Sequence, residues 1–340
     1  MLARVVENVY WLARYLERAE NTARLVSVNT NLLLDLPSGY APGWLPLIDI
    51  TGGRQLFDEK HPRADERDVV QFLIASLDNP GSIHSSLRAA RENARTVRET
   101  LPSEVWELLN QSFLEFASDL PNGLNKRTRF DFLKRVVLCV QTLMGKLEGT
   151  MNRNDAYTFL MIGRNLERAD MTSRIVDVRS AQLLPADTPE LRPFDTIQWM
   201  SVLKSLSGHQ MYRLKLRARV RRADVLEFLL RDDQFPRACL FCLDQVEACL
   251  RSLPHNEGVL DALADVRAFL HEAQLAQLDQ PGLHELIDRL QLHVINLHDA
   301  IATIYFPARA GTRPAPSFSR SQEQRQTQSL PLFVDSLTPT

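Results

Sequence analysis

The sequence predicts an all-α protein, a multi-helix bundle with two related helical halves and a disordered C-terminal tail. Three observations predict this fold. Long segments repeat apolar residues with the period of an amphipathic helix. No stretch shows the alternation of β-branched residues expected of a central strand. One helical segment near the N-terminus recurs 150 residues later in the chain.

The recurring segment reads WLARYLERAENTARL at residues 11–25 and MIGRNLERADMTSRI at residues 161–175. Each residue of an α-helix turns by about 100°. One face of the first copy therefore carries charged side chains, and the opposite face is apolar, as a core-facing helix requires. The second copy repeats this split. Seven of the fifteen positions are identical, namely Arg14/Arg164, Leu16/Leu166, Glu17/Glu167, Arg18/Arg168, Ala19/Ala169, Thr22/Thr172 and Arg24/Arg174.

The charged face has two readings. A solvated face with salt bridges is common on amphipathic helices. Surface charge, however, has little physical reason to keep residue identity in two places, whereas a polar site between two helices does. We therefore expect the two faces to meet across a pseudo-twofold axis, because partly buried charges persist only when they are paired. Glu17 would be held by Arg168 or Arg164, and Glu167 by Arg18 or Arg14. The candidate polar cluster comprises Arg14, Glu17, Arg18, Arg164, Glu167 and Arg168.

Composition and charge place the chain among soluble globular proteins. Of its 340 residues, 44% are hydrophobic and 24% are charged, a typical balance for one large domain or two ordinary ones. The formal charge of −2 gives no bulk bias toward nucleic acid or membrane. No apolar run approaches the roughly 18–20 residues of a spanning helix, and the N-terminus, with Arg4 and Glu7, does not resemble a signal peptide. We expect a cytoplasmic protein.

Motifs for metals, cofactors and known catalytic sites are missing from the sequence. Cys239-x-x-Cys242 lies in an apolar helical stretch without a second cysteine pair, which favours buried free thiols over a metal or redox site. His293 and His298 do not share a helix face. No Gly-rich phosphate loop, HExxH or G-x-S-x-G motif occurs. We therefore predict no metal and no cofactor, and the catalytic residues, if any, stay unknown.

The doubled Arg/Glu face is the only feature with catalytic potential. Its arginines could clamp a carboxylate or a phosphate. One of its glutamates could act as a general base if burial raised its pKa.

Element by element, the first half begins with a helix over residues 2–34. A long irregular connection rich in proline and glycine follows over 35–64. Asp65 then has the position of an N-cap. Asn79 and Pro80 predict the start of the next helix, which extends to about Thr100.

Further helices are expected over about 103–118 and 126–149, and the second copy of the charged motif lies in a helix over 154–184. A shorter helix follows near 194–206. The run RLKLRARVR at 213–221 alternates with period two, so we predict an extended basic segment. Such a segment could contact phosphates or an acidic partner, or it could lie over the fold as a solvated connector.

A second, weaker echo supports two related halves. Pro80 and Leu87 correspond in spacing to Pro236 and Leu243 at the start of a later helix. Helices over about 256–276 and 282–305 would complete the fold, with pseudo-repeats of about 1–150 and 151–306. From Pro307 the chain is rich in Pro, Ser, Thr and Gln, which predicts a disordered tail over 307–340.

The paired motifs LERAENTARL and LERADMTSRI make the chain similar to the bacterial alpha-E domain family, which is all-helical and named for its Glu-Arg motif. The similarity extends to NPGSI at 79–83, RAARENAR at 88–95, and DVLEFLL with FPRACLFCL within 224–243. It identifies residues 1–306 as an alpha-E helical domain. The segment 221–224 echoes the motif only loosely, with Arg in place of Glu, so no site is assigned to it.

The resemblance implies a setting rather than a reaction. Members of the family typically occur beside or fused to ATP-grasp proteins of the amide-ligase kind, often with transglutaminase-like or proteasome-like peptidases. This implies an accessory or scaffold partner of an ATP-grasp amide/peptide ligase in a peptide synthesis, modification or processing system. The alternative is an enzyme of peptide or amide chemistry that uses the paired Arg/Glu cluster. Nucleic-acid binding through 213–222 is disfavoured, because the chain is nearly neutral and Tyr212 is the only adjacent aromatic residue.

Overall fold

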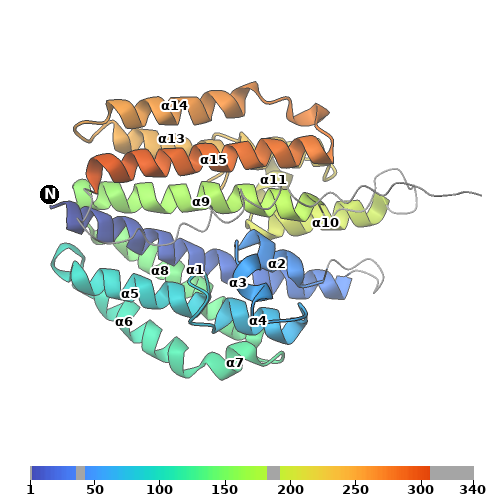
Figure 1. Cartoon of the computed structure of the whole chain (residues 1–340), viewed down its shortest axis with the longest axis horizontal. Coiled ribbons are helices and arrows are strands. Elements are labelled where there is room, and N and C mark those ends of the chain that lie inside the picture. The colour runs from blue at the N-terminus through green and yellow to red at the C-terminus, as the bar shows by residue number, and fades with distance from the viewer. Residues whose placement is uncertain (1, 36–42, 182–191, 307–340) are drawn as a thin grey trace, which may run out of the picture.

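Two long helices form the centre of the protein. In the computed structural model, which describes residues 2–35, 43–181 and 192–306, α1 (Ala3–Asp35) and α9 (Asp155–Ala181) lie side by side and run parallel (Figure 1). The described residues are helical or lie in turns and loops, and they contain no strand. The predicted all-α fold is confirmed.

The first half builds a layer on the outer side of α1. Helices α5 (Ile83–Thr96) and α8 (Arg129–Thr150) both pack against α1, and α6 (Ser103–Ser118) packs against α5 and α8. Apolar side chains of α5 such as Leu87 and Ala90 are buried in the hydrophobic core. This layer lies below the two central helices in Figure 1.

The second half builds the matching layer on α9. Helices α13 (Cys239–Leu250) and α15 (Gln280–Tyr305) pack against α9, and α14 (Glu257–Glu272) packs against α13 and α15. The two central helices are therefore covered on opposite sides (Figure 1). The polar faces of α1 and α9 are left to face each other.

Two pairs of helices recur at the same interval along the chain. α4 (Glu66–Ile74) begins at residue 66 and α12 (Arg222–Leu230) at residue 222, while α5 begins at 83 and α13 at 239, so both pairs are 156 residues apart. We infer from this succession that the halves are related. The predicted tail over 307–340 lies outside the described residues.

The sequence predicts an irregular connection over 35–64, and this prediction is wrong for part of it. Its described part forms α2 (Leu45–Ile50) and α3 (Arg54–Asp58). Proline in the first turn starts α2, and its apolar residues are buried. Helices of five or six residues are too short for a periodic pattern to stand out among prolines and glycines. α2 packs against α9 in the other half.

The prediction of an extended segment over 213–221 is wrong for residues 213–216, which are helical. α11 (His209–Leu216) continues to Leu216, and Arg217 ends it in the left-handed conformation with φ of 50°. Only the residues after it are non-helical before α12. Because most side chains of this stretch are exposed, their alternation carries no information about packing. The helix before it, α10 (Arg192–Ser205), packs against α1.

Local caps explain where two of the helices begin. The Asp65 carboxylate accepts a backbone N–H from the first turn of α4, as predicted. Asn79 does not cap α5, because the hydroxyl of Ser82 does. The Asn79 side chain instead accepts the N–H of Gly81, and this turn places Gly81 at the edge of a pocket that residues of α1 and α9 also line. A short helix, α7 (Leu120–Leu124), connects α6 to α8.

No helix in the described part of the chain combines the length and the apolarity that crossing a membrane requires.

Candidate functional site

The structure brings the six residues of the candidate polar cluster together between α1 and α9. The Glu167 carboxylate accepts from Arg14 Nε at 2.7 Å and from Arg18 Nε at 2.6 Å. Glu17 lies 2.9 Å from Arg168 Nε and 3.6 Å from Arg164 Nε. Each glutamate therefore pairs with the arginines of the other helix. Both glutamates are only 1% exposed, so a solvated face does not describe them.

Helix geometry explains this reciprocal pairing. On each helix, residues three and four apart share a face, so Arg14, Glu17 and Arg18 project together toward α9. Because the helices run parallel, the same three-residue pattern on α9 meets them at the same level. Close approach is possible because Gly163 has no side chain where α9 passes the backbone of Tyr10.

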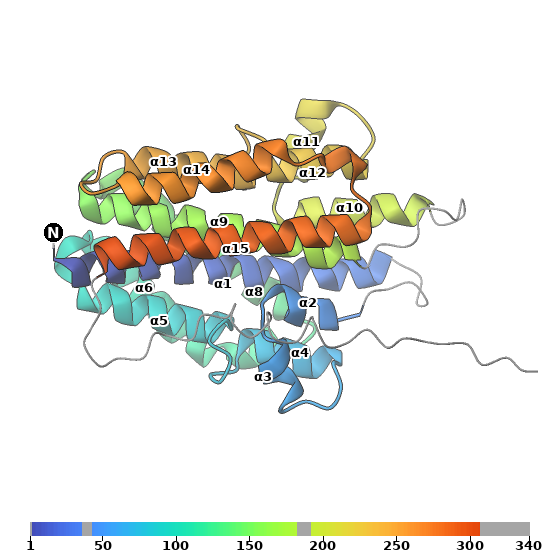
Figure 2. The same cartoon turned by 45° about the horizontal axis from the view of Figure 1, so that its top comes forward.

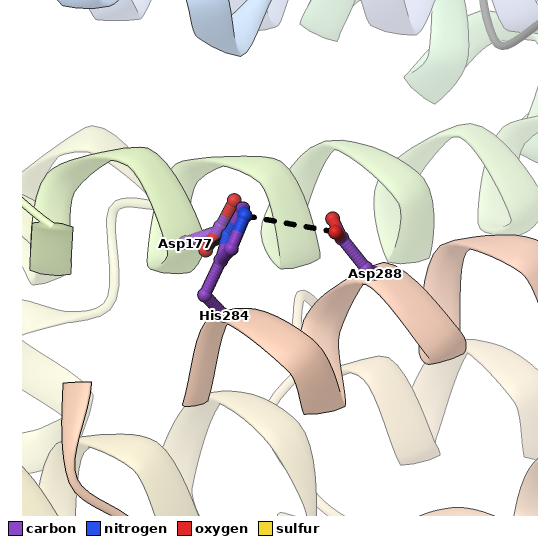
Figure 3. A group of neighbouring side chains, drawn as sticks. All are labelled: Asp177, His284 and Asp288. Atoms are coloured by element: carbon purple, nitrogen blue, oxygen red, sulfur yellow. Dashed lines mark hydrogen bonds and ion pairs between the residues drawn. The ribbon is translucent and has the colours of Figure 1, made fainter. Parts of the chain in front are cut away.

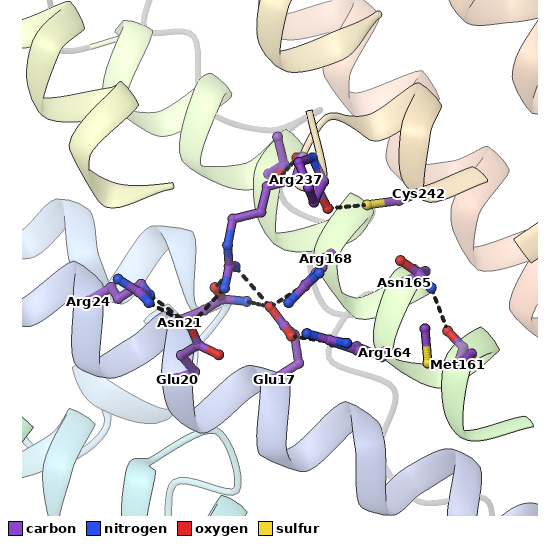
Figure 4. A network of polar contacts seen from close by, with 12 residues as sticks. Glu17, Glu20, Asn21, Arg24, Met161, Arg164, Asn165, Arg168, Arg237 and Cys242 are labelled. Atoms are coloured by element: carbon purple, nitrogen blue, oxygen red, sulfur yellow. Dashed lines mark hydrogen bonds and ion pairs between the residues drawn. The ribbon is translucent and has the colours of Figure 1, made fainter. Parts of the chain in front are cut away.

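Arg237 also belongs to the cluster, and the sequence analysis missed it. From the turn before α13, its guanidinium donates to Glu17 at 2.8 Å, to Glu20 at 2.8 Å and to Asn21 at 2.7 Å (Figure 4). These contacts span more than 200 positions of the chain. One signal in the sequence could have indicated Arg237. It is a single arginine between Pro236 and the apolar start of a helix, and a charge that is buried there needs a partner.

The arginines hold both glutamates in the ionised form. Burial alone would raise the pKa of Glu17, but the charges of Arg168 and Arg237 outweigh it and lower that pKa to about 2. Burial likewise opposes ionisation of Glu167, and Arg18 and Arg14 lower its pKa to about 2. A general base at neutral pH needs a pKa near the working pH. The raised pKa that the enzyme reading requires is therefore not present in either carboxylate.

A buried hydrogen-bond chain extends the cluster toward α15. Arg14 Nη1 donates to the Tyr10 hydroxyl at 3.1 Å, and that hydroxyl lies 2.7 Å from His298 Nδ1. Arg14 occupies one lone pair of the hydroxyl and leaves its proton available to Nδ1. Burial, and then the charge of Arg14, lowers the pKa of His298 to about 3. His298 is therefore a neutral acceptor.

Asp177, His284 and Asp288 form a second polar group between α9 and α15 (Figure 3). His284 Nδ1 lies 2.8 Å from Asp177, and Nε2 lies 3.6 Å from Asp288. These residue types could hold a metal ion, and their ligand atoms lie within 4.8 Å of one another. Both ring nitrogens, however, already face carboxylates. Burial alone would lower the pKa of His284, but the hydrogen bond and charge of Asp177 raise it.

His284 therefore lies between two carboxylates, and the hydrogen bond and charge of Asp177 favour its protonated form. Sequence analysis found no metal signature and did not single out this group. The i,i+4 pair of His284 and Asp288 was the only local signal, because Asp177 is 107 positions away.

The free thiols predicted for Cys239 and Cys242 are confirmed, and both are buried. Burial raises the pKa of Cys242 to about 12. A thiol that stays protonated is a poor nucleophile and a poor metal ligand.

Comparisons with known proteins place the cluster in a family context. Residues 1–306 match Alpha-E, described as a predicted alpha-helical domain with a conserved ER motif. An uncharacterised protein of Mycobacterium bovis and one from each of two Mycobacterium tuberculosis strains are each 23% identical over 343 residues. These alignments cover 92% of this chain and 38% of each relative, so the chain spans well under half of their length.

No solved structure matches the chain. Glu-Arg pairs stand in this chain at residues 17–18 and 167–168, inside the match, and they lie at the contact of the two central helices. The chain therefore belongs to the Alpha-E family.

Proposed function

We propose that this chain is a non-catalytic helical partner of an ATP-grasp-type amide or peptide ligase, in a system that makes, modifies or processes a peptide. The class of partner follows from the family resemblance. The observation that supports a binding role is an exposed surface of mixed apolar and basic character on α11.

This α11 surface contains Met211 and Leu214, which are 46% and 59% exposed. They are one helical turn apart, so they lie on one face. Arg213, Arg217 and Arg219 are exposed beside them and form no ion pair with another described residue. α11 lies at the edge of the second half (Figure 2). Exposed apolar side chains with adjacent charge are typical of protein-binding surfaces, and the charge here fits an acidic partner.

The described pockets do not favour the alternative, an enzyme of peptide chemistry. The pocket at the Arg/Glu cluster has a volume of about 40 Å³, which is too small to enclose the main chain of a peptide substrate. A larger pocket of about 280 Å³ lies between α1 and α10, and Lys204 is the one ionisable residue in its lining. Neither pocket combines substrate size with an acid and a base in suitable protonation states.

Co-purification with an ATP-grasp-type amide ligase from the same organism tests the proposal. The wild-type chain is expected to retain the ligase on an affinity resin, less strongly at high salt because basic contacts are screened. The double change Met211→Asp and Leu214→Asp should abolish retention. Leu138→Asp on α8 is the matched control, since Leu138 is also 50% exposed. Failure of the wild-type chain to associate would overturn the proposal.

A further inference from the structure

The central cluster contains one pair of acidic residues on α1 and a corresponding pair on α9, and the two pairs differ in how many guanidinium groups donate to them. Glu17 and Glu20 on α1 both accept hydrogen bonds from Arg237. Their counterparts on α9 are Glu167 and Asp170. Arg237 follows Pro236 in the turn before α13, and the residue that follows the corresponding proline, before α5, is Gly81. The second acidic pair therefore lacks the side chain that serves the first.

A pocket lies where that side chain would be. It has a volume of about 40 Å³ and borders Gly81. Glu167, Asp170 and Met171 line it, and they are the α9 counterparts of the three residues that Arg237 contacts on α1. The pocket thus corresponds in position to the Arg237 guanidinium of the other half.

The pocket differs from the filled site in charge and in polarity. Glu20 accepts from Arg24 and from Arg237, whereas the Asp170 carboxylate has Arg174 as its only hydrogen-bond donor among the described residues. Asn21 is replaced by Met171, whose thioether makes one wall less polar. A cationic head group on a short apolar stem fits this combination.

Thr22 supplies an independent indication of a ligand. Thr22 is one of the residues that line the pocket and is fully buried, yet its hydroxyl has no hydrogen-bond partner in the described structure. The counterpart hydroxyl, that of Thr172, donates to the carbonyl oxygen of Arg237 at 2.8 Å. Buried hydroxyl groups normally have a hydrogen-bond partner. A ligand bound in the pocket would supply the partner that the Thr22 hydroxyl lacks.

We propose that this pocket binds the guanidinium group of a ligand, either the arginine side chain of a peptide or a small guanidino compound. The guanidinium donates to Asp170 and to the Thr22 hydroxyl, and its alkyl stem lies on Met171. Arg18 and Arg174 also line the pocket, but their guanidinium groups already bind Glu167 and Asp170. An anion would have to compete with those carboxylates. The site is separate from the α11 surface, so it goes beyond the docking role.

Calorimetric titration of the full chain with agmatine, a guanidinium on a short alkyl stem, tests the proposal. Agmatine is expected to bind saturably. An arginine-containing tripeptide tested in parallel distinguishes a peptide ligand from a small guanidino compound. Asp170→Asn should weaken binding by about tenfold or more, since a charged hydrogen-bond acceptor is lost. Far-UV circular dichroism checks that this variant folds.

Gly81→Arg is the more decisive variant, because it supplies the missing side chain from within. A Cβ at Gly81 would approach only Asn79 Oδ1, at 3.3 Å, and the Thr51 carbonyl oxygen, at 4.0 Å. We expect this variant to lose agmatine binding and to melt at a higher temperature. Gly145→Arg, where an added Cβ meets nothing within 4 Å, is the control and should bind normally.

The proposal is overturned if neither agmatine nor the tripeptide binds the wild-type chain, or if Gly81→Arg binds as tightly as wild type. Binding of inorganic phosphate without agmatine would mark an anion site and would overturn it as well.

Discussion

Gly163 on α9 lies against the backbone carbonyl of Tyr10 on α1, and a Cβ added to Gly163 would stand 2.3 Å from that oxygen. The clash involves backbone on both sides, so neither helix can relieve it by a rotamer change. Gly163→Ala is therefore expected to destabilise the protein by about 1–3 kcal/mol or more, despite the roughly 1 kcal/mol that alanine gains over glycine in a helix. Urea denaturation measures the difference.

Gly145→Ala on α8 provides the matched control, because a Cβ there meets nothing within 4 Å. Its helix propensity should raise the stability. If Gly163→Ala were as stable as Gly145→Ala, the close parallel contact of α1 and α9 would be wrong.

Glu17→Gln should cost about 3–5 kcal/mol of folding free energy, because it leaves buried guanidinium groups without their carboxylate. Arg168 and Arg237 would then face each other across a neutral amide. Thermal melts with circular dichroism provide the measurement. The catalytic reading expects instead a loss of activity with an almost unchanged melting temperature.

Arg95→Ala removes a comparable ion pair from the surface and serves as the control for Glu17→Gln. The Arg95 side chain is 62% exposed and pairs with Glu92, so the expected cost is under about 1 kcal/mol. Equal losses of folding free energy in the two variants would mean that the central cluster is not shielded from water.

His298 should make the protein lose stability as the pH falls below about 6.5. Its folded pKa, about 3, lies below the ordinary value of 6.5. Between these values the unfolded state binds a proton that the folded state does not, so stability decreases with decreasing pH. His298→Gln keeps an acceptor for Tyr10 but cannot titrate in this range.

Melting temperatures from pH 4.5 to 7 test the role of His298, since Glu17 and Glu167 contribute mainly below pH 4.5. The slope of the melting temperature against pH should be smaller in His298→Gln than in wild type. Identical slopes would count against a buried neutral imidazole.

Titration of His284 should change the stability with pH in the direction opposite to that of His298. Its folded pKa is raised by Asp177, so its contribution is complete below the ordinary value of 6.5 and is lost as the pH rises through the raised value. Melting temperatures above pH 6.5 should therefore fall in wild type and change less in His284→Gln.

The reciprocal pairing of Glu17 and Glu167 is predictable from sequence, because helix geometry fixes which residues share a face and two matching copies indicate that the faces meet. Arg237 is not predictable in the same way, since its counterpart is Gly81 and no repeat marks it. Asp177 and His284 come together only through packing of α9 on α15. The exposed side chains of α11 carry no core-facing period, so their alternation predicts the wrong structure.

The placement of charge at the centre has a consequence for synthesis of the chain. Arg14 and Glu167 are 153 positions apart, so at ribosomal rates of about 5–20 residues per second Glu167 follows Arg14 by roughly 8–30 s. During that interval the inner face of α1 presents arginine and glutamate to water instead of leucine and valine. The nascent first half therefore exposes less apolar surface during this interval than an apolar inner face would expose.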